Sequence, residues 1–195
     1  MKSKGIKTTL IMFVLVALVL GYYLYLSHRN GEASSVEAAQ AQASEEMTPV
    51  QDILARANFR EYPATPVQVL KYYNEITACF YNEDYTEDEL SELAKLASSL
   101  YDDELVANQS FPDYIAALKE DIAVFHNGNM TVYDSTVTPS TDVVYFSHNG
   151  YECAKLYSTY TLKSGTLYQS TREVFILRKD SDGHWKIFGF DLAEE

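Results

Sequence analysis

The sequence contains only two cysteines, Cys79 and Cys153, in 195 residues. Two are too few for the disulfide framework of a small secreted domain. In an oxidising compartment they could still form one bridge, although their spacing matches no metal or redox motif. We expect instead two small buried side chains, one on a helix and one on a strand.

Basic residues are also scarce, because 15 lysines and arginines stand against 28 aspartates and glutamates and give a net charge of −13. Basic and acidic residues balance within 1–46, so the whole acidic excess lies in residues 47–195. An acidic domain of this size repels phosphate backbones, which argues against a nucleic-acid partner.

Motifs of known chemistry are absent from the sequence. There is no P-loop, no dinucleotide-binding glycine motif, no H-E-x-x-H and no G-x-S-x-G. The histidines show no ligand spacing, and Asp180–Gly183 has only the beginning of a calcium loop, so it predicts a turn. We therefore predict no catalytic residue, no metal site and no bound cofactor, and we favour a non-enzymatic role.

The sequence does contain one long apolar run without charge, Thr8–Leu26. At about 1.5 Å per helical residue it is close to the thickness of a bilayer's hydrocarbon core. Three lysines lie in residues 1–7, and this bias predicts a cytoplasmic N-terminus and an extracytoplasmic C-terminal domain. The alternative is a cleavable signal peptide. We expect an uncleaved single-pass anchor, because the Ala41-Gln42-Ala43 site lies far beyond the run.

Two further segments follow the anchor. Residues 27–46 are rich in Ala, Ser, Gln and Glu and contain no large apolar residue beyond Val36, which predicts a flexible or partly helical tether. Residues 47–195 are one domain's worth of chain and long enough to bury a core.

The first half of this domain has helical periodicity. Apolar residues at helical spacing follow four capping signals, at Thr48-Pro49, Thr65-Pro66, Thr86 and Ser110. Thr86 and the glutamate three residues later form a capping box. The last of the four predicted helices ends at Asn127-Gly128-Asn129.

The second half has the two-residue period of strands. The Asn149-Gly150 pair is a strong hairpin signal. The predicted strands are Met130–Val137, Asp142–Ser147, Ala154–Leu162, Thr171–Lys179 and Trp185–Phe190. Helices followed by a meandering antiparallel sheet predict an α+β fold, with several helices packed on a curved sheet.

Three segments carry a resemblance to a known fold: YYNEITACFYNEDY at Tyr72–Tyr85, REVFILRK at Arg172–Lys179 and GHWKI at Gly183–Ile187. With the order of helices and strands, they resemble the nuclear-transport-factor-two-like cone that ketosteroid isomerase shares. Helices fill residues 49–126, whereas many cone folds insert an early strand between the second and third helices. More narrowly, the layout resembles a group of uncharacterised bacterial membrane-anchored proteins, which implies a fold and a topology but no reaction.

The resemblance suggests where a site would lie. Ketosteroid-isomerase chemistry needs a carboxylate base in a dry pocket with tyrosine donors. Tyr72, Tyr73, Tyr157 and Tyr160 are the tyrosines expected at the mouth of a cone, and nothing in the sequence selects the acid that would face them.

Three hypotheses remain for the domain's task. The first is a binding or interaction module for an envelope protein, a wall component or a small apolar ligand. The second is a small-molecule isomerase or hydrolase that uses the cone pocket. The third is an assembly module that forms a homodimer through its open sheet.

Overall fold

The computed structural model describes residues 47–193, and the chain divides into two units after Met47. The predicted stub 1–7, anchor 8–26 and tether 27–46 lie outside the described residues. Within 47–193, no helix has both the length and the apolar character needed to cross a bilayer.

The helices begin where the capping signals predict. Thr48, Thr65, Thr86 and Ser110 each accept a hydrogen bond from a backbone N–H in the first turn of the helix that follows. A short additional helix, capped by Asp102, was not predicted. The helices are α2 (Pro49–Ala57), α3 (Pro66–Asn82), α4 (Glu87–Ser98), α5 (Asp103–Val106) and α6 (Phe111–Asn127).

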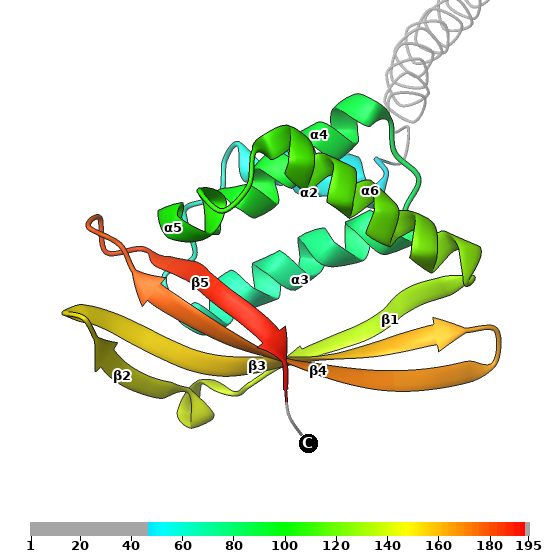
Figure 1. Ribbon diagram of the computed structural model, residues 1–195. Coiled ribbons are helices and arrows are strands. Elements are labelled where there is room, and N and C mark those ends of the chain that lie inside the picture. Colours follow the sequence, from blue (N-terminus) through cyan, green and yellow to red (C-terminus); the bar gives the residue numbers. More distant parts are fainter. Residues whose placement is uncertain (1–46, 194–195) are drawn as a thin grey trace, which may run out of the picture. The chain divides into compact units, whose positions relative to one another are not determined.

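Five antiparallel strands form one curved sheet, which confirms the predicted α+β fold (Figure 1). The strands are β1 (Met130–Val137), β2 (Val144–His148), β3 (Tyr151–Ser164), β4 (Leu167–Lys179) and β5 (Trp185–Leu192). Four of them follow the order β1-β3-β4-β5, and β2 pairs with β3 beside this path. β1 and β2 both pair with β3, β1 with its C-terminal half and β2 with its N-terminal end. The two strands therefore share one edge of the sheet.

The strand boundaries differ from the prediction in two places. β2 begins two residues later than expected because Ser140–Asp142 forms a 3₁₀ turn. β3 and β4 pair over twelve residues each, almost to the tip of their hairpin, so both strands are longer than expected. The Asn149-Gly150 turn is confirmed, with positive φ at both residues.

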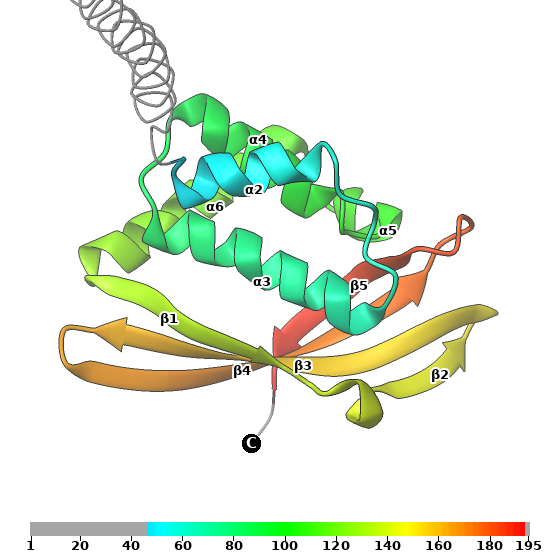
Figure 2. The same ribbon diagram turned by 180° about the vertical axis from the view of Figure 1, so that it is seen from behind.

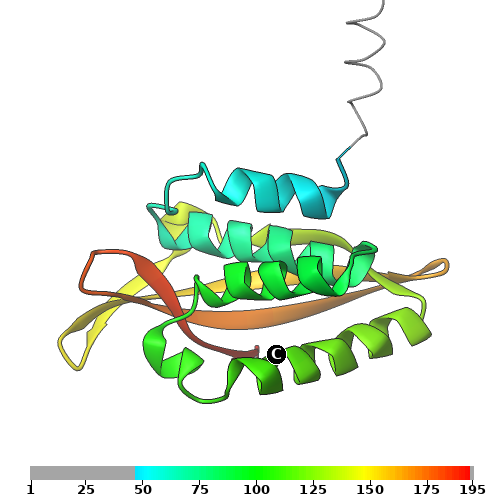
Figure 3. The same cartoon turned by 90° about the horizontal axis from the view of Figure 1, so that it is seen from above.

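Helix α3 lies along the concave face of the sheet (Figure 1). Helices α2 and α4 lie on the side of α3 that faces away from the strands (Figures 1 and 2). Seen from above, α2 and α6 run on opposite sides of α3 (Figure 3). The core lies between these layers. Its largest fully buried side chains include Leu70 and Ile76 of α3 and Leu156, Phe175 and Ile187 of the sheet.

Asn82 attaches the end of α3 to the first strand. β1 has a bulge between Val132 and Asp134. The Asn82 side-chain amide donates to the Val132 carbonyl at 2.8 Å and accepts from the Val132 N–H at 2.8 Å. These two bonds satisfy backbone groups that the bulge removes from regular pairing.

No strand precedes β1 within residues 47–193, so helices fill the segment where many cone folds have an early strand. Tyr101 forms only a single parallel bridge with Ile187 of β5. The two cysteines are both buried and free, Cys79 on α3 and Cys153 on β3, which confirms their predicted placement.

Candidate functional site

A cavity of about 370 Å³ lies between α3, α6 and the concave face of the sheet. We call it the tyrosine cavity, because five tyrosines from two helices, the segment between α4 and α5, and one strand line it. Most of the other lining residues are apolar, and they include Phe80, Leu118 and Phe125. The five tyrosines are Tyr73, Tyr81, Tyr101, Tyr114 and Tyr160.

Glu173 projects into this cavity from β4, directly opposite Ser158 of β3. Among the described residues its carboxyl has neither an ion-pair partner nor a hydrogen-bond partner. Burial raises its pKa above the ordinary value of 4.5, because an ion is poorly solvated in an aromatic cavity. Its charge also contributes to raising the pKa of Tyr73 and Tyr81, which line the same cavity.

A pair of hydroxyl groups lies at one side of the cavity. The Tyr73 and Tyr101 oxygens are 3.1 Å apart, and either can donate. Burial is the main cause that raises the pKa of both phenols far above their usual value of 10.0. Both hydroxyls therefore stay protonated at neutral pH, and the one that accepts within the pair has its own proton free to donate to a ligand.

Tyr160 is held in place by a buried polar network. Its hydroxyl donates to Asn74 Oδ1 at 2.7 Å, and Asn74 Nδ2 donates to Ser158 Oγ at 2.7 Å. Asn74 and Ser158 are both buried. Since each polar atom in this network has a partner, the network orients the Tyr160 ring at little cost in desolvation.

Aromatic side chains form much of the lining. Tyr81 of α3 stacks on Phe125 of α6, with ring centroids 4.1 Å apart. A second, more apolar cavity of about 190 Å³ shares four lining residues with the first, Tyr101, Gln109, Tyr114 and Phe190. The two cavities are therefore adjacent.

The four tyrosines expected at a cone mouth are separated by the structure. Tyr73 and Tyr160 lie together in the cavity. Tyr72 is buried elsewhere, with its ring beneath the Arg60 guanidinium at 4.2 Å, and its hydroxyl has no partner among the described residues.

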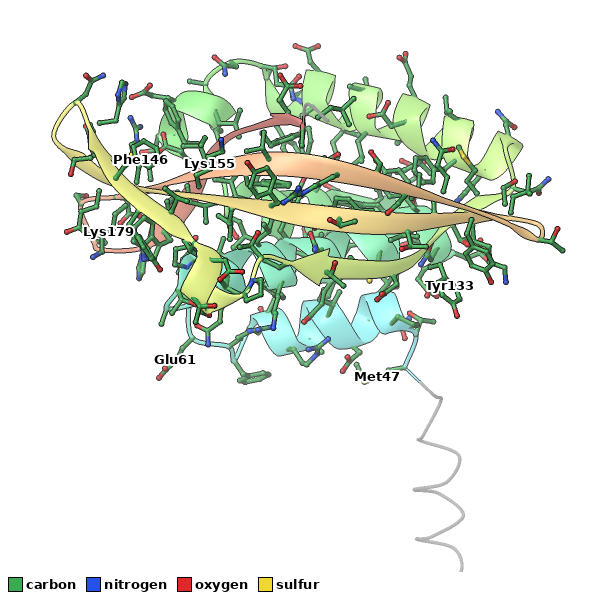
Figure 4. All side chains as sticks on the ribbon, turned by 90° about the horizontal axis from the view of Figure 1, so that it is seen from below. Met47, Glu61, Tyr133, Phe146, Lys155 and Lys179 are labelled. Atoms are coloured by element: carbon green, nitrogen blue, oxygen red, sulfur yellow. The ribbon has the colours of Figure 1, made fainter. Side chains whose placement is uncertain are left out.

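Tyr157 is on the opposite face of the sheet, where its ring packs against the Arg172 guanidinium at 4.0 Å. Figure 4 views the molecule from that side, on which Lys155 also lies. Tyr157 and Tyr160 differ by three positions on one strand, so their side chains must point to opposite faces.

Several lining residues were not predicted as site residues, although the sequence carries a signal for those on α6 and for Glu173. Tyr114, Leu118, Asp121 and Phe125 recur at helical spacing and so share one stripe of α6. Glu173 lies two residues before the fully buried Phe175, so the alternation of β4 directs its carboxyl toward the helices.

The arrangement suits the binding of a molecule with an apolar body and a polar or positively charged group. Among residues 47–193 there is no cluster of His, Cys, Asp or Glu able to hold a metal ion. Glu173 can also accept a proton when it is ionised, with tyrosine hydroxyls nearby as donors.

Comparison with known proteins adds one match. A family model described as "Domain of unknown function (DUF6715)" matches residues 1–190. No curated protein matches the chain.

Proposed function

We propose that this chain, which belongs to the family described as Domain of unknown function (DUF6715), is a membrane-anchored domain that binds a small, largely apolar ligand. The observation that carries the proposal is the tyrosine cavity. Its volume of about 370 Å³ falls within the usual range of ligand sites, and its lining combines aromatic and aliphatic side chains with hydroxyl and carboxyl groups.

The proposed location follows from the sequence. An uncharged run at residues 8–26 behind three lysines supports a single-pass anchor with a cytoplasmic N-terminus. In this arrangement the tether, residues 27–46, holds the domain outside the cytoplasm. The acidic excess of the domain supports a position away from anionic lipid head groups.

We also propose that the domain has the cone-like fold of the nuclear-transport-factor-two-like proteins. The long helix α3 in the concavity and a cavity between helices and curved sheet support this proposal. The continuous run of helices before β1 is the point at which the chain departs from many such folds.

Ala117 offers a direct test, because it lines the cavity from α6, whereas its neighbour Ala116, which is exposed as Ala117 is, does not. The full chain would be purified from its own membranes into nanodiscs, since detergent would itself enter an apolar cavity. Native mass spectrometry should detect a bound small molecule in the wild type and in Ala116→Phe, and not in Ala117→Phe. A wild-type chain without any bound molecule, or an equal content in both variants, would contradict the proposal.

A second function is favoured by one observation, the unpartnered Glu173 beside tyrosine hydroxyls. In an isomerase the Glu173 carboxylate would remove a proton from a carbon next to a carbonyl and return it to another carbon, while a hydroxyl stabilises the enolate. Such an enzyme would exchange that proton of a bound ketone for deuterium in heavy water, and Glu173→Gln would not. A ketone that binds and keeps its protons would exclude this function.

A further inference from the structure

We infer that the ligand of the tyrosine cavity is an organic cation, an amine or quaternary ammonium group on an apolar body, with its charge between Glu173 and Asp121. The inference rests on the proposed function and specifies the class of ligand. It starts from the charges that line the cavity.

Both charged side chains in the cavity lining are acidic. Glu173 comes from the sheet and Asp121 from α6. No lysine, arginine or histidine of residues 47–193 lines this cavity or the adjacent smaller one. An anionic ligand would therefore meet like charge on two walls, whereas a cation would meet opposite charge on both.

The chain's own cations do not neutralise Glu173. Arg172 precedes it on β4, and for that reason its guanidinium lies on the other face of the sheet against Tyr157. Lys119, two residues before Asp121 on α6, pairs with Glu87. A neutral apolar ligand would bury Glu173 further without supplying a partner, while a bound cation supplies one.

The aromatic walls favour the same class of ligand. The faces of tyrosine and phenylalanine rings attract cations, and aromatic cages of this kind bind quaternary ammonium groups. Tyr81 lines the same cavity as both acids, and the charge of Asp121 and then that of Glu173 add to burial in raising its pKa to about 12. Its ring is therefore beside the place where the cationic head would lie.

The lining also offers surface for an apolar body. Phe80, Leu118 and Leu162 line the main cavity. The adjacent smaller cavity, which shares Tyr101, Tyr114 and Phe190 with it among others, offers a further apolar surface. A ligand with a compact charged head and an apolar chain or ring matches this distribution of lining groups.

A matched pair of probes tests the charge directly. Para-hydroxyphenyl-trimethylammonium and para-tert-butylphenol have nearly the same shape and differ in replacing a cationic nitrogen with carbon. Each would be titrated calorimetrically into the full chain in nanodiscs, with empty nanodiscs of the same lipid as the blank. We expect the cation to bind about tenfold more tightly or better than its neutral counterpart, because it gains cation–π and ionic contacts.

Three substitutions locate the effect. Glu173→Gln and Asp121→Asn keep shape and remove charge, and each should reduce the advantage of the cation while leaving the neutral probe's affinity unchanged. Glu120→Gln is the matched control, because Glu120 is an exposed neighbour on α6 that does not line the cavity. It changes the net charge equally and should leave both affinities at the wild-type value.

The outcomes separate this inference from the proposed function. If the neutral probe binds as tightly as the cation, or if Glu173→Gln and Asp121→Asn do not change the ratio, the ligand is not a cation and the apolar site stands. If neither probe binds, the inference is overturned and the cavity is not the ligand site of the proposed function either.

Discussion

Asp102 binds Arg178 through both carboxylate oxygens, with Nη2 donating at 2.5 Å and Nε at 2.8 Å. The two side chains are only 5% and 13% exposed. The pair connects the segment between α4 and α5 to β4, the strand that carries Glu173. Asp102 also caps α5 by accepting the Glu104 N–H at 2.9 Å. Tyr101 is adjacent to Asp102 in sequence, so this ion pair helps to position one wall of the cavity.

Replacement of Asp102 by alanine should therefore destabilise the protein strongly. The change leaves the Arg178 charge buried without its main partner and removes a helix cap, and losses of this kind amount to about 3–5 kcal/mol. Urea unfolding followed by circular dichroism measures the change. Glu104→Ala is the control, because Glu104 also binds Arg178, at 2.9 Å, but is mostly exposed and should cost less than about 1 kcal/mol. Equal losses of unfolding free energy for the two variants would show that the buried Asp102–Arg178 pair stabilises the protein no more than the exposed Glu104–Arg178 pair does.

Asn82→Ala should loosen the start of the sheet. The substitution removes both hydrogen bonds to Val132, at about 1 kcal/mol each, so we expect a loss of about 2 kcal/mol. Hydrogen exchange provides a local measurement, since the Val132 amide should lose protection first. Asn58→Ala, at an exposed helix end, should change neither quantity by a comparable amount. Unchanged protection at Val132 would contradict this interpretation of the bulge.

Local signals made much of the fold predictable. A side chain such as Thr86 caps the helix that begins one residue later, and Asn149-Gly150 makes a tight turn whatever surrounds it. These interactions are encoded within a few residues. Periodicity likewise assigned Met130–Val137 to a strand without reference to the rest of the chain.

The site depended on contacts between distant segments, and only half of the expected tyrosines lie in it. Tyr73 meets Tyr101 across 28 positions of the chain, and Tyr101 belongs to a segment fixed by a remote ion pair. Helical spacing alone cannot tell which of Tyr72 and Tyr73 faces a cavity when both faces of α3 are covered. The sequence did hold one unused clue, which is that Glu173 is in phase with the buried side chains of β4.

Glu173→Gln should stabilise the protein at neutral pH. The folded-state pKa of Glu173 is raised above 4.5, so its contribution to stability is fully present below that pH and is lost as pH rises through the raised value. The wild type and Glu173→Gln should therefore have similar melting temperatures in acid, and the variant should melt higher near pH 7. Asp121→Asn is the comparison, because Asp121 is the other acid of the cavity lining but is an exposed residue. A lower melting temperature for Glu173→Gln at neutral pH would mean that its carboxylate has a stabilising partner.

The proposed anchor predicts how the chain fractionates. The full chain should remain with membranes after an alkaline carbonate wash, because an inserted apolar helix is released by neither salt nor pH. A chain that starts at Met47 should be recovered in the soluble fraction. Protease added to intact cells should cut the full chain if the domain is extracytoplasmic. Release of the full chain by carbonate would contradict the anchor, and protection from protease in intact but not in lysed cells would contradict the orientation.

The affinity for a quaternary ammonium probe should rise with pH, and Glu173 should be the cause. The ammonium charge of the probe is permanent and its phenol stays largely protonated up to neutral pH, so the pH dependence over this range belongs to the protein. The titratable groups that share the cavity with Glu173 are Asp121 and five tyrosines, and burial raises the pKa of each of those phenols. The phenols therefore stay protonated from acid to neutral pH.

A bound cation favours the ionised form of Glu173, so binding to the protonated protein must release a proton and is weaker. The affinity of para-hydroxyphenyl-trimethylammonium should accordingly increase as the pH rises from 4.5, because burial raises the pKa of Glu173 above that ordinary value. Glu173→Gln should make this profile flat, whereas Asp121→Asn should lower affinity but keep the rise. Calorimetry in two buffers of different ionisation enthalpy would also detect the released proton. A flat wild-type profile would show that Glu173 does not contact the cation, since a carboxyl that pairs with the ligand has to lose its proton first.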